Sequence, residues 1–257
     1  MLFDSHCHLN DDALYPNIDE IIENAKKAGV CKFLVVGYNK ASSFLAVKIA
    51  EQYPECYAAI GFHPCDIYDI NEDDYNETMA LANHKKVVAI GEIGLDYHWI
   101  KEPEKKDLQK EFFIRQIEFA NEHQLPISIH NRESNEDCLK ILKEHTPKYG
   151  GVMHCYSGSV EMLNDVLNLG LHISLGGPVT FTNAKTPKEV AENVPLEKLL
   201  LETDCPYLTP HPHRGEKNEP KYVCLVCEEV ARLKDISKKH VEQVTYQNTL
   251  RLFKIDE

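Results

Sequence analysis

Residues 2–8 read Leu-Phe-Asp-Ser-His-Cys-His, so two histidines follow directly on a short strand-like run at the start of the chain. Alternate residues of a β-strand point to the same side, and His6 and His8 can therefore project together while Cys7 points away. Taken alone, such a pair is equally typical of two ordinary polar residues at the point where a strand runs into a loop. Its interpretation depends on whether the rest of the chain repeats the arrangement.

The arrangement recurs at four further apolar runs. Seven ligand-type residues each lie at or close to the end of a run: His6, His8, Glu92, His130, His154, Glu202 and Asp204. Imidazole nitrogens and carboxylate oxygens from separate strands form a metal site when they converge on one face. The pattern predicts a metallohydrolase with its site at the ends of several strands.

The spacing of the apolar runs predicts the fold. Eight strand-like runs cover residues 2–5, 32–37, 57–61, 87–91, 126–130, 151–155, 171–175 and 198–203. Stretches between them, such as Ile18–Ala28 and Leu108–Glu122, carry apolar residues at helical spacing. Alternating strands and helices predict βαβ units and a parallel sheet, and eight units favour a single-domain (β/α)₈ TIM barrel over residues 1–257. The alternative, an open doubly wound sheet, lacks its glycine-rich phosphate motif here.

Composition narrows the class of protein. The formal net charge of −13 argues against a broad basic surface for nucleic acid. It does not exclude a phosphate-bearing substrate, because bound divalent cations can reverse the local potential. Nine scattered cysteines suit reduced thiols rather than a disulfide framework, and the start of the chain lacks the pattern of a secretory signal. We therefore expect a cytoplasmic protein that is not inserted in a membrane.

Further residues are candidates for the substrate side of the site. His63 ends the third run, within Gly-Phe-His-Pro, and is interpreted as functional or structural with equal weight. Arg132 and Arg214 have the fork geometry that suits phosphate, against the alternative of ordinary surface arginines. The irregular stretch 206–220 has the length of a functional loop. The remaining histidines show no grouping and are interpreted as structural or solvent-facing: His84, His98, His123, His145, His172 and His240.

At these residues the sequence resembles the TatD family of metal-dependent deoxyribonucleases, within the amidohydrolase superfamily. The matching segments occur in the family's order at residues 4–9, 61–64, 91–96, 129–132, 154–158, 201–207 and 214–220. The resemblance covers essentially the whole chain and implies a distorted TIM barrel with the active site at the C-terminal ends of the strands.

The resemblance also implies a site for two divalent cations, of magnesium, manganese or zinc. It implies that the first cation is held by His6, His8, Glu92 and Asp204, and that Glu92 bridges to a second held by His130 and His154. His63 and Glu202 are then expected to line the site and to bind or orient the scissile phosphate. Asp204 is the expected general base, and His63, Arg132 or Arg214 are expected to offset charge on the phosphoryl oxygens.

The implied reaction is hydrolysis of phosphodiester bonds in DNA, or in RNA, with 3′→5′ trimming of single-stranded DNA the typical activity of the family. The alternative enzyme is a metal-dependent lactonase or amidohydrolase. Many such relatives bridge their metals with a modified lysine where this chain has Glu92, which favours the nuclease-like subgroup. A third hypothesis is a non-catalytic, metal-bound scaffold. The sequence does not determine the oligomeric state, and a monomer is compatible with it.

Overall fold

The computed structural model describes residues 1–256, and Glu257, the last residue of the predicted domain, lies outside the described residues. Eight strands follow one another along the chain: β1 (Leu2–Cys7), β2 (Val30–Val36), β3 (Cys56–Ile60), β4 (Val87–Asp96), β5 (Ile127–Arg132), β6 (Gly151–Met153), β7 (His172–Leu175) and β8 (Leu199–Leu201). They form one parallel sheet in the order β1 to β8. The predicted (β/α)₈ barrel is confirmed.

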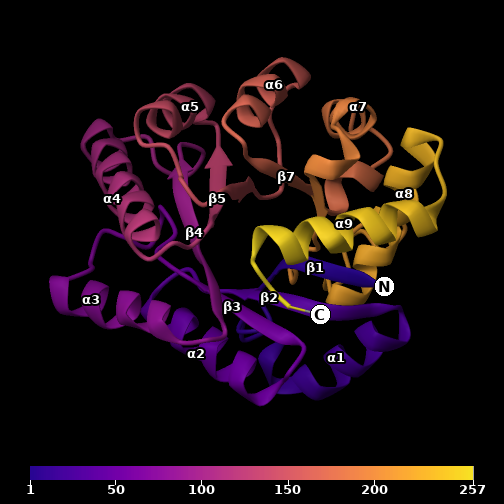
Figure 1. Ribbon diagram of the computed structural model, residues 1–257, viewed down its shortest axis with the longest axis horizontal. Coiled ribbons are helices and arrows are strands. Elements are labelled where there is room, and N and C mark those ends of the chain that lie inside the picture. Colours follow the sequence, from indigo (N-terminus) through magenta and orange to yellow (C-terminus); the bar gives the residue numbers. More distant parts are fainter. Residues whose placement is uncertain (257) are drawn as a thin grey trace.

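Helices separate the strands and surround the sheet (Figure 1). They are α1 (Ile18–Lys27), α2 (Lys40–Gln52), α3 (Glu72–Ala80), α4 (Pro103–Glu122), α5 (Asn135–Glu144), α6 (Val160–Asn168), α7 (Thr186–Asn193), α8 (Val223–Lys234) and α9 (Lys238–Leu252). Short 3₁₀ turns complete the order: η1 (Tyr15–Asn17), η2 (Leu81–Asn83), η3 (Gly177–Thr180), η4 (Leu196–Lys198) and η5 (Pro220–Tyr222). Within residues 1–256, no helix is both long enough and apolar enough to cross a membrane.

The barrel is nearly closed, and its seam lies between β8 and β1. There Ser5 Oγ donates to the carbonyl oxygen of Leu201 at 2.9 Å. Beyond β8, the backbone N–H of Asp204 donates to the carbonyl oxygen of His6, and that of His8 donates to Cys205, both at 2.9 Å. These bonds hold the histidine pair of β1 against the carboxylate that follows β8.

The local sequence accounts for the elements. In α1, the side chains of Ile18, Ile21, Ile22 and Ala25 recur at helical spacing and are all buried. All ten residues of β4 are buried, as expected of a parallel strand covered on both faces. Strand β4 extends five residues beyond the predicted run 87–91, so Glu92 lies within the strand rather than after it.

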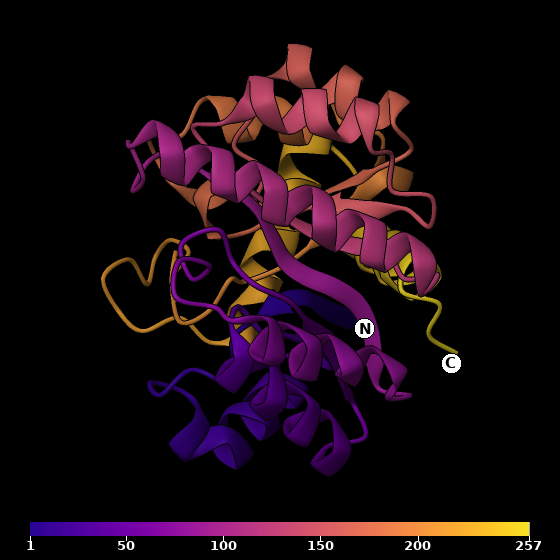
Figure 2. The ribbon, with the colours of Figure 1, turned by 90° about the vertical axis from the view of Figure 1, so that its left-hand side faces the viewer.

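The two ends of the barrel differ in what covers them. Figure 2 shows the long loops after the strands on one side of the molecule, with α9 and both termini on the other. At the terminal side, Phe3, Leu34 and Leu200 from the strands belong to one buried apolar cluster with Tyr246 and Phe253. The loop side is the C-terminal end of the strands, where the candidate site lies.

Candidate metal centre

Six side chains from five strands meet at the C-terminal end of the barrel. His6, Glu92 and His130 lie within β1, β4 and β5, whereas His8, His154 and Asp204 follow β1, β6 and β8. The structure brings these six predicted ligands together in one group.

Glycines let β4 and β5 approach closely at this point. Gly94 has φ +145°, a conformation that other residues rarely adopt, and a Cβ added to it would collide with the carbonyl oxygen of His130. Gly91 lies similarly close to Ser128. The two glycines therefore set the spacing of the strands that carry Glu92 and His130.

One cluster of ligand atoms lies between β1 and the segment after β8. The Nε2 atoms of His6 and His8 are 3.3 Å apart. Asp204 Oδ1 lies 3.8 Å from the first and 3.4 Å from the second. Glu92 Oε2 completes the cluster at 3.6 and 3.7 Å from the same two nitrogens.

A second cluster lies between β4, β5 and β6. His130 Nδ1 and His154 Nε2 are 3.4 Å apart, and each is 2.8 Å from Glu92 Oε1. His63 Nε2 lies 3.7 Å from the same oxygen. The nearest histidines to the two oxygens of Glu92 thus form two different pairs.

These donor sets fit divalent cations. A neutral imidazole has one nitrogen without a proton, and that nitrogen repels a second lone pair unless a cation or proton lies between them. Metal–nitrogen distances of about 2.0–2.1 Å give an edge of about 3.3–3.4 Å between neighbouring ligands in tetrahedral geometry. The observed nitrogen pairs, at 3.3 and 3.4 Å, have this spacing.

The outer nitrogens of the histidines have partners of their own. His8 Nδ1 lies 3.0 Å from the carbonyl oxygen of Val36, and His130 Nε2 lies 3.1 Å from Asp96 Oδ2. Among residues 1–256 only acceptors face these two nitrogens, so each of them donates, which leaves the inner nitrogen of each ring free to bind a metal. Such outer partners are typical of metal-binding histidines, because they fix the tautomer and the orientation of the ring.

Burial and mutual charge shift the pKa values in the centre. Burial disfavours ionised Glu92, but the charge of His154 and hydrogen bonds from His130 and His154 outweigh it and hold the pKa of Glu92 well below its usual value. Burial likewise opposes protonation of His8, yet its bond with Asp204 raises the pKa of His8 overall. The centre therefore keeps anionic carboxylates buried among imidazoles, as a cation site requires.

His63 remains neutral in this environment. Burial and the neighbouring His130 lower the pKa of His63 to about 3. Its Nδ1 accepts a hydrogen bond from the backbone N–H of Cys65 at 3.1 Å, so the proton lies on Nε2. His63 thus presents an N–H donor toward the centre.

Glu202 lies behind His154. Its Oε1 accepts a hydrogen bond from the backbone N–H of Cys155 at 2.7 Å, and its Oε2 accepts one from Ser174 Oγ. His154 Nδ1 is 3.5 Å from Oε1, and Glu202 is fully buried. This geometry lets Glu202 orient His154, and its expected role in binding or orienting the scissile phosphate stays a prediction.

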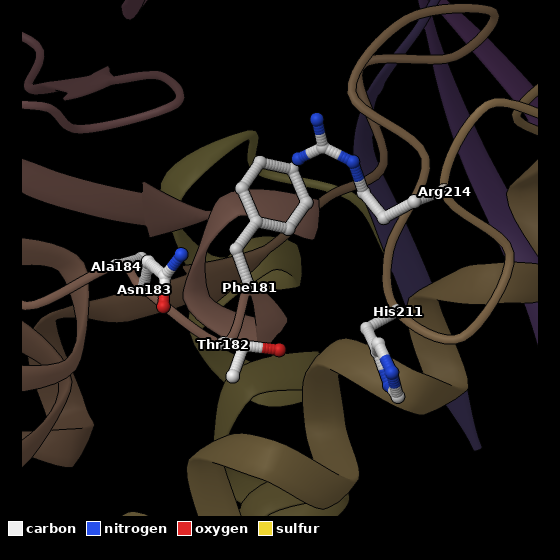
Figure 3. Close-up of a pocket in the computed structure, with 6 residues that line it drawn as sticks. All are labelled: Phe181, Thr182, Asn183, Ala184, His211 and Arg214. Atoms are coloured by element: carbon white, nitrogen blue, oxygen red, sulfur yellow. The ribbon is translucent and has the colours of Figure 1, made fainter.

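Both candidate arginines lie outside the centre, over aromatic rings. The guanidinium carbon of Arg132 is 5.5 Å from the centroid of the Trp99 ring. That of Arg214 is 3.7 Å from the centroid of Phe181. Arg214 and Phe181 also line a cavity of about 470 Å³ between the loops that follow β7 and β8 (Figure 3).

Asp96 is the supporting residue to which sequence reasoning assigned no role. Its Oδ2 holds His130, and its Oδ1 accepts hydrogen bonds from the backbone N–H groups of His98 and Trp99, both at 2.9 Å. The available signal was its position four residues after Glu92, because residues at even spacing on a strand share a face.

Comparison with known proteins assigns the family. The profile described as TatD related DNase matches residues 3–254. The chain belongs to this family. Members of it share the barrel and the metal-dependent hydrolase class, so this protein is a metal-dependent hydrolase of the amidohydrolase superfamily.

The following relatives match over at least 96% of their lengths. The chain is 48% identical over 257 residues to the uncharacterized metal-dependent hydrolase YabD of Bacillus subtilis, covering 100% of both chains. It is 38% identical over 260 residues to the metal-dependent hydrolase YcfH of Escherichia coli, covering 99% of this chain and 96% of the relative. The crystal structure of the TatD homologue YJJV of Escherichia coli superposes with a TM-score of 0.94 at 28% identity, covering 99% and 98%.

Proposed function

We propose that the protein hydrolyses phosphodiester bonds of nucleic acid with two divalent cations, and that it trims single-stranded DNA in the 3′→5′ direction. The observation that carries this proposal is Glu92, whose Oε1 and Oε2 each face a separate pair of histidines. A carboxylate in this position can bridge two cations, and a two-cation site suits in-line displacement at phosphorus. The family's description as TatD related DNase supports the same substrate class.

The bound cations would acidify a water molecule and stabilise the charge that develops on the phosphate and the leaving oxygen. His6, His8 and Asp204 would hold one of them, His130 and His154 the other, and Glu92 both. Magnesium, manganese and zinc all accept such imidazole and carboxylate ligands.

Asp204 is the proposed general base. It has φ +56°, a conformation that costs a non-glycine residue free energy and is found at functional sites. The bond from its backbone N–H to His6 holds this conformation, and its carboxylate is 15% exposed. Asp204 can therefore contact His8 and accept a proton from a water molecule on its open side.

The substrate side of the site is assigned to neutral and cationic donors. His63 would donate a hydrogen bond from its Nε2–H to a phosphoryl oxygen, because its Nδ1 already accepts a hydrogen bond. Arg132 and Arg214 would bind phosphates further along the strand. Glu202 would position His154 through the contact with its Nδ1.

The proposed setting is the cytoplasm, with DNA, or RNA, as the macromolecular partner. All nine cysteines are free thiols, which fits a reducing compartment. The proposed mechanism uses residues of a single chain, so a monomer would suffice for it.

The deciding experiment compares substrates and metals. Purified protein is incubated with Mg²⁺, Mn²⁺ or Zn²⁺ on labelled single-stranded DNA, on RNA and on a panel of lactones, each with and without chelator. We expect chelator-sensitive loss of terminal nucleotides from the 3′ end. Activity on lactones alone would identify a lactonase, and inactivity on every substrate with metal bound would identify a scaffold.

The base assignment has its own test. Asp204→Asn keeps the shape of the side chain but binds no proton near neutral pH, so we expect kcat to fall by roughly 10²–10⁴-fold. The melting temperature of the variant should stay close to that of the parent. Near-normal kcat would remove Asp204 both as the base and as a required ligand of the first cation, and would leave the roles proposed for His130 and His154 unaffected.

A further inference from the structure

The five arginines of the chain fall into two groups. Arg115 forms a paired contact with Glu72 at 2.8 and 2.6 Å, Arg232 does so with Glu229, and Arg251 donates to Asn248. Within residues 1–256, by contrast, the guanidinium groups of Arg132 and Arg214 have no hydrogen-bonded or ion-pair partner. Acidic residues outnumber Lys and Arg by 41 to 28, so carboxylate partners are plentiful. The two unpaired arginines are those at the mouth of the barrel.

Trp99 lies beside Arg132 and is the only tryptophan of the chain. Its side chain is 67% exposed, although burial of a side chain this large would be favourable. Its ring is nearly perpendicular to that of His98, with the ring centroids 4.7 Å apart. The guanidinium carbon of Arg132 lies 5.5 Å from the centroid of the Trp99 ring. An aromatic surface is therefore presented to solvent next to an unpaired cation.

This surface is tied to the metal centre. Asp96 accepts a hydrogen bond from the backbone N–H of Trp99 through Oδ1, and holds His130 through Oδ2. Arg132 follows His130 by two residues on β5. A single side chain, that of Asp96, thus connects the metal-centre residue His130 to the backbone of Trp99.

We propose that Trp99 is a stacking platform for a base of single-stranded nucleic acid, with Arg132 holding the adjoining phosphate. The proposal rests on the proposed function and adds the element that recognises the substrate. A chain of net charge −13 cannot hold a polyanion by a broad basic surface. Stacking on an aromatic ring supplies affinity that is independent of sequence and needs no net positive charge.

The second arginine–aromatic pair is less suited to this role. Arg214 lies only 3.7 Å from the centroid of Phe181 and so covers one face of that ring. Phe181 is also partly buried, whereas Trp99 is exposed. Between the two pairs, the open aromatic face belongs to Trp99.

The test uses the whole, metal-loaded protein. Trp99 is the sole tryptophan, so its fluorescence should be quenched as a nuclease-resistant phosphorothioate oligonucleotide is added. The midpoint should match binding of the same labelled oligonucleotide measured by anisotropy. For Trp99→Ala we expect KM on single-stranded DNA to rise roughly 5- to 150-fold, the range for loss of one stacked base, with kcat within about twofold. Trp99→Phe should recover most of the loss.

A substrate without bases separates stacking from structural damage. On an oligonucleotide with abasic residues next to the scissile bond, the parent and Trp99→Ala should have equal KM values, because there is no base to stack. Tyr149→Ala is the matched control. Tyr149 also carries a cation over its ring, that of Lys254 at 4.8 Å, but it precedes β6 at the opposite end of the barrel. Its KM should equal that of the parent.

The outcomes distinguish this inference from the proposed function. If the parent cleaves single-stranded DNA and Trp99→Ala has the same KM, the platform is overturned and the nuclease assignment stands. An equal rise of KM on abasic and intact substrates would also overturn the platform. If the parent neither binds nor cleaves nucleic acid with metal present, both proposals fail together.

Discussion

The two ends of the barrel are built from the same eight strands but bury opposite kinds of side chain. At the C-terminal end, Glu92, His6 and His154 are at most 7% exposed and face one another. At the other end, Phe3 packs with Tyr246 and Phe253 beneath α9. Buried charge costs free energy unless it is paired or coordinated, whereas buried apolar surface is favourable without partners. The difference indicates that one end supplies chemistry and the other supplies stability.

The largest expected effect tests the chemical end. Glu92→Gln replaces the carboxylate that faces both histidine clusters by a neutral amide. Each cation contributes several kcal/mol to stabilising the transition state, so we expect activity to fall by roughly a thousandfold or more. Metal content per chain, measured by atomic emission, should fall with it.

The matched control is Glu51→Gln. Glu51 also pairs with a histidine, since its Oε1 lies 3.1 Å from His84 Nε2, but its side chain is 58% exposed and this pair lies outside the metal centre. Activity and metal content should be unchanged in this variant. If the Glu92→Gln protein keeps both its metal and its activity, Glu92 is not a required metal ligand.

The next effect tests the stabilising end. Phe253 is 2% exposed and packs in the apolar cluster beneath α9. Phe253→Ala leaves a cavity, and we expect it to lower the free energy of unfolding by about 3–5 kcal/mol. Urea unfolding measures this change, while kcat and KM below the transition should match the parent. A fall in kcat at full folding would show that the two ends are coupled.

A smaller effect is expected one step away from the metals. Asp96→Asn weakens the acceptor for His130 Nε2 but keeps its shape. Loss of such an outer partner typically costs 10- to 100-fold in metal affinity or activity, and we expect a change in that range. Titration of metal into the chelated protein checks it. Unchanged affinity would mean that packing alone orients His130.

The strands and the ligand types could be predicted from the sequence because both follow from local patterns. The apolar runs marked all eight strands, and polar residues at their ends marked the candidate ligands. Sequence reasoning missed where β4 ends, because Glu92 continues a strand that the apolar run 87–91 no longer marks. It also missed the contact of Asp96 with His130, since side-chain partners across strands depend on register. The pairing of Arg132 with Trp99 was hidden for the same reason.

The smallest effect concerns a histidine outside the metal centre. His172 begins β7, and its Nδ1 is buried without a hydrogen-bond partner among residues 1–256. Burial, followed by the charges of Lys198 and Arg251, lowers the pKa of His172 to about 4 from 6.5. The unfolded chain therefore binds this proton more readily between those values. Stability from the neutral ring is complete above pH 6.5 and is lost as the pH falls toward 4.

His172→Gln removes this titration. Melting temperatures of parent and variant, measured from pH 7 to 4 in chelator, should converge as the pH falls, because only the parent loses this contribution. Using chelator in both samples cancels the titration of the metal-centre histidines, which the two proteins share. Parallel curves would mean that His172 is hydrated enough to be protonated in the folded state. Converging curves, with activity at neutral pH unchanged, would show that His172 contributes to stability. It would then differ in role from the histidines of the metal centre, although it is the same type of residue.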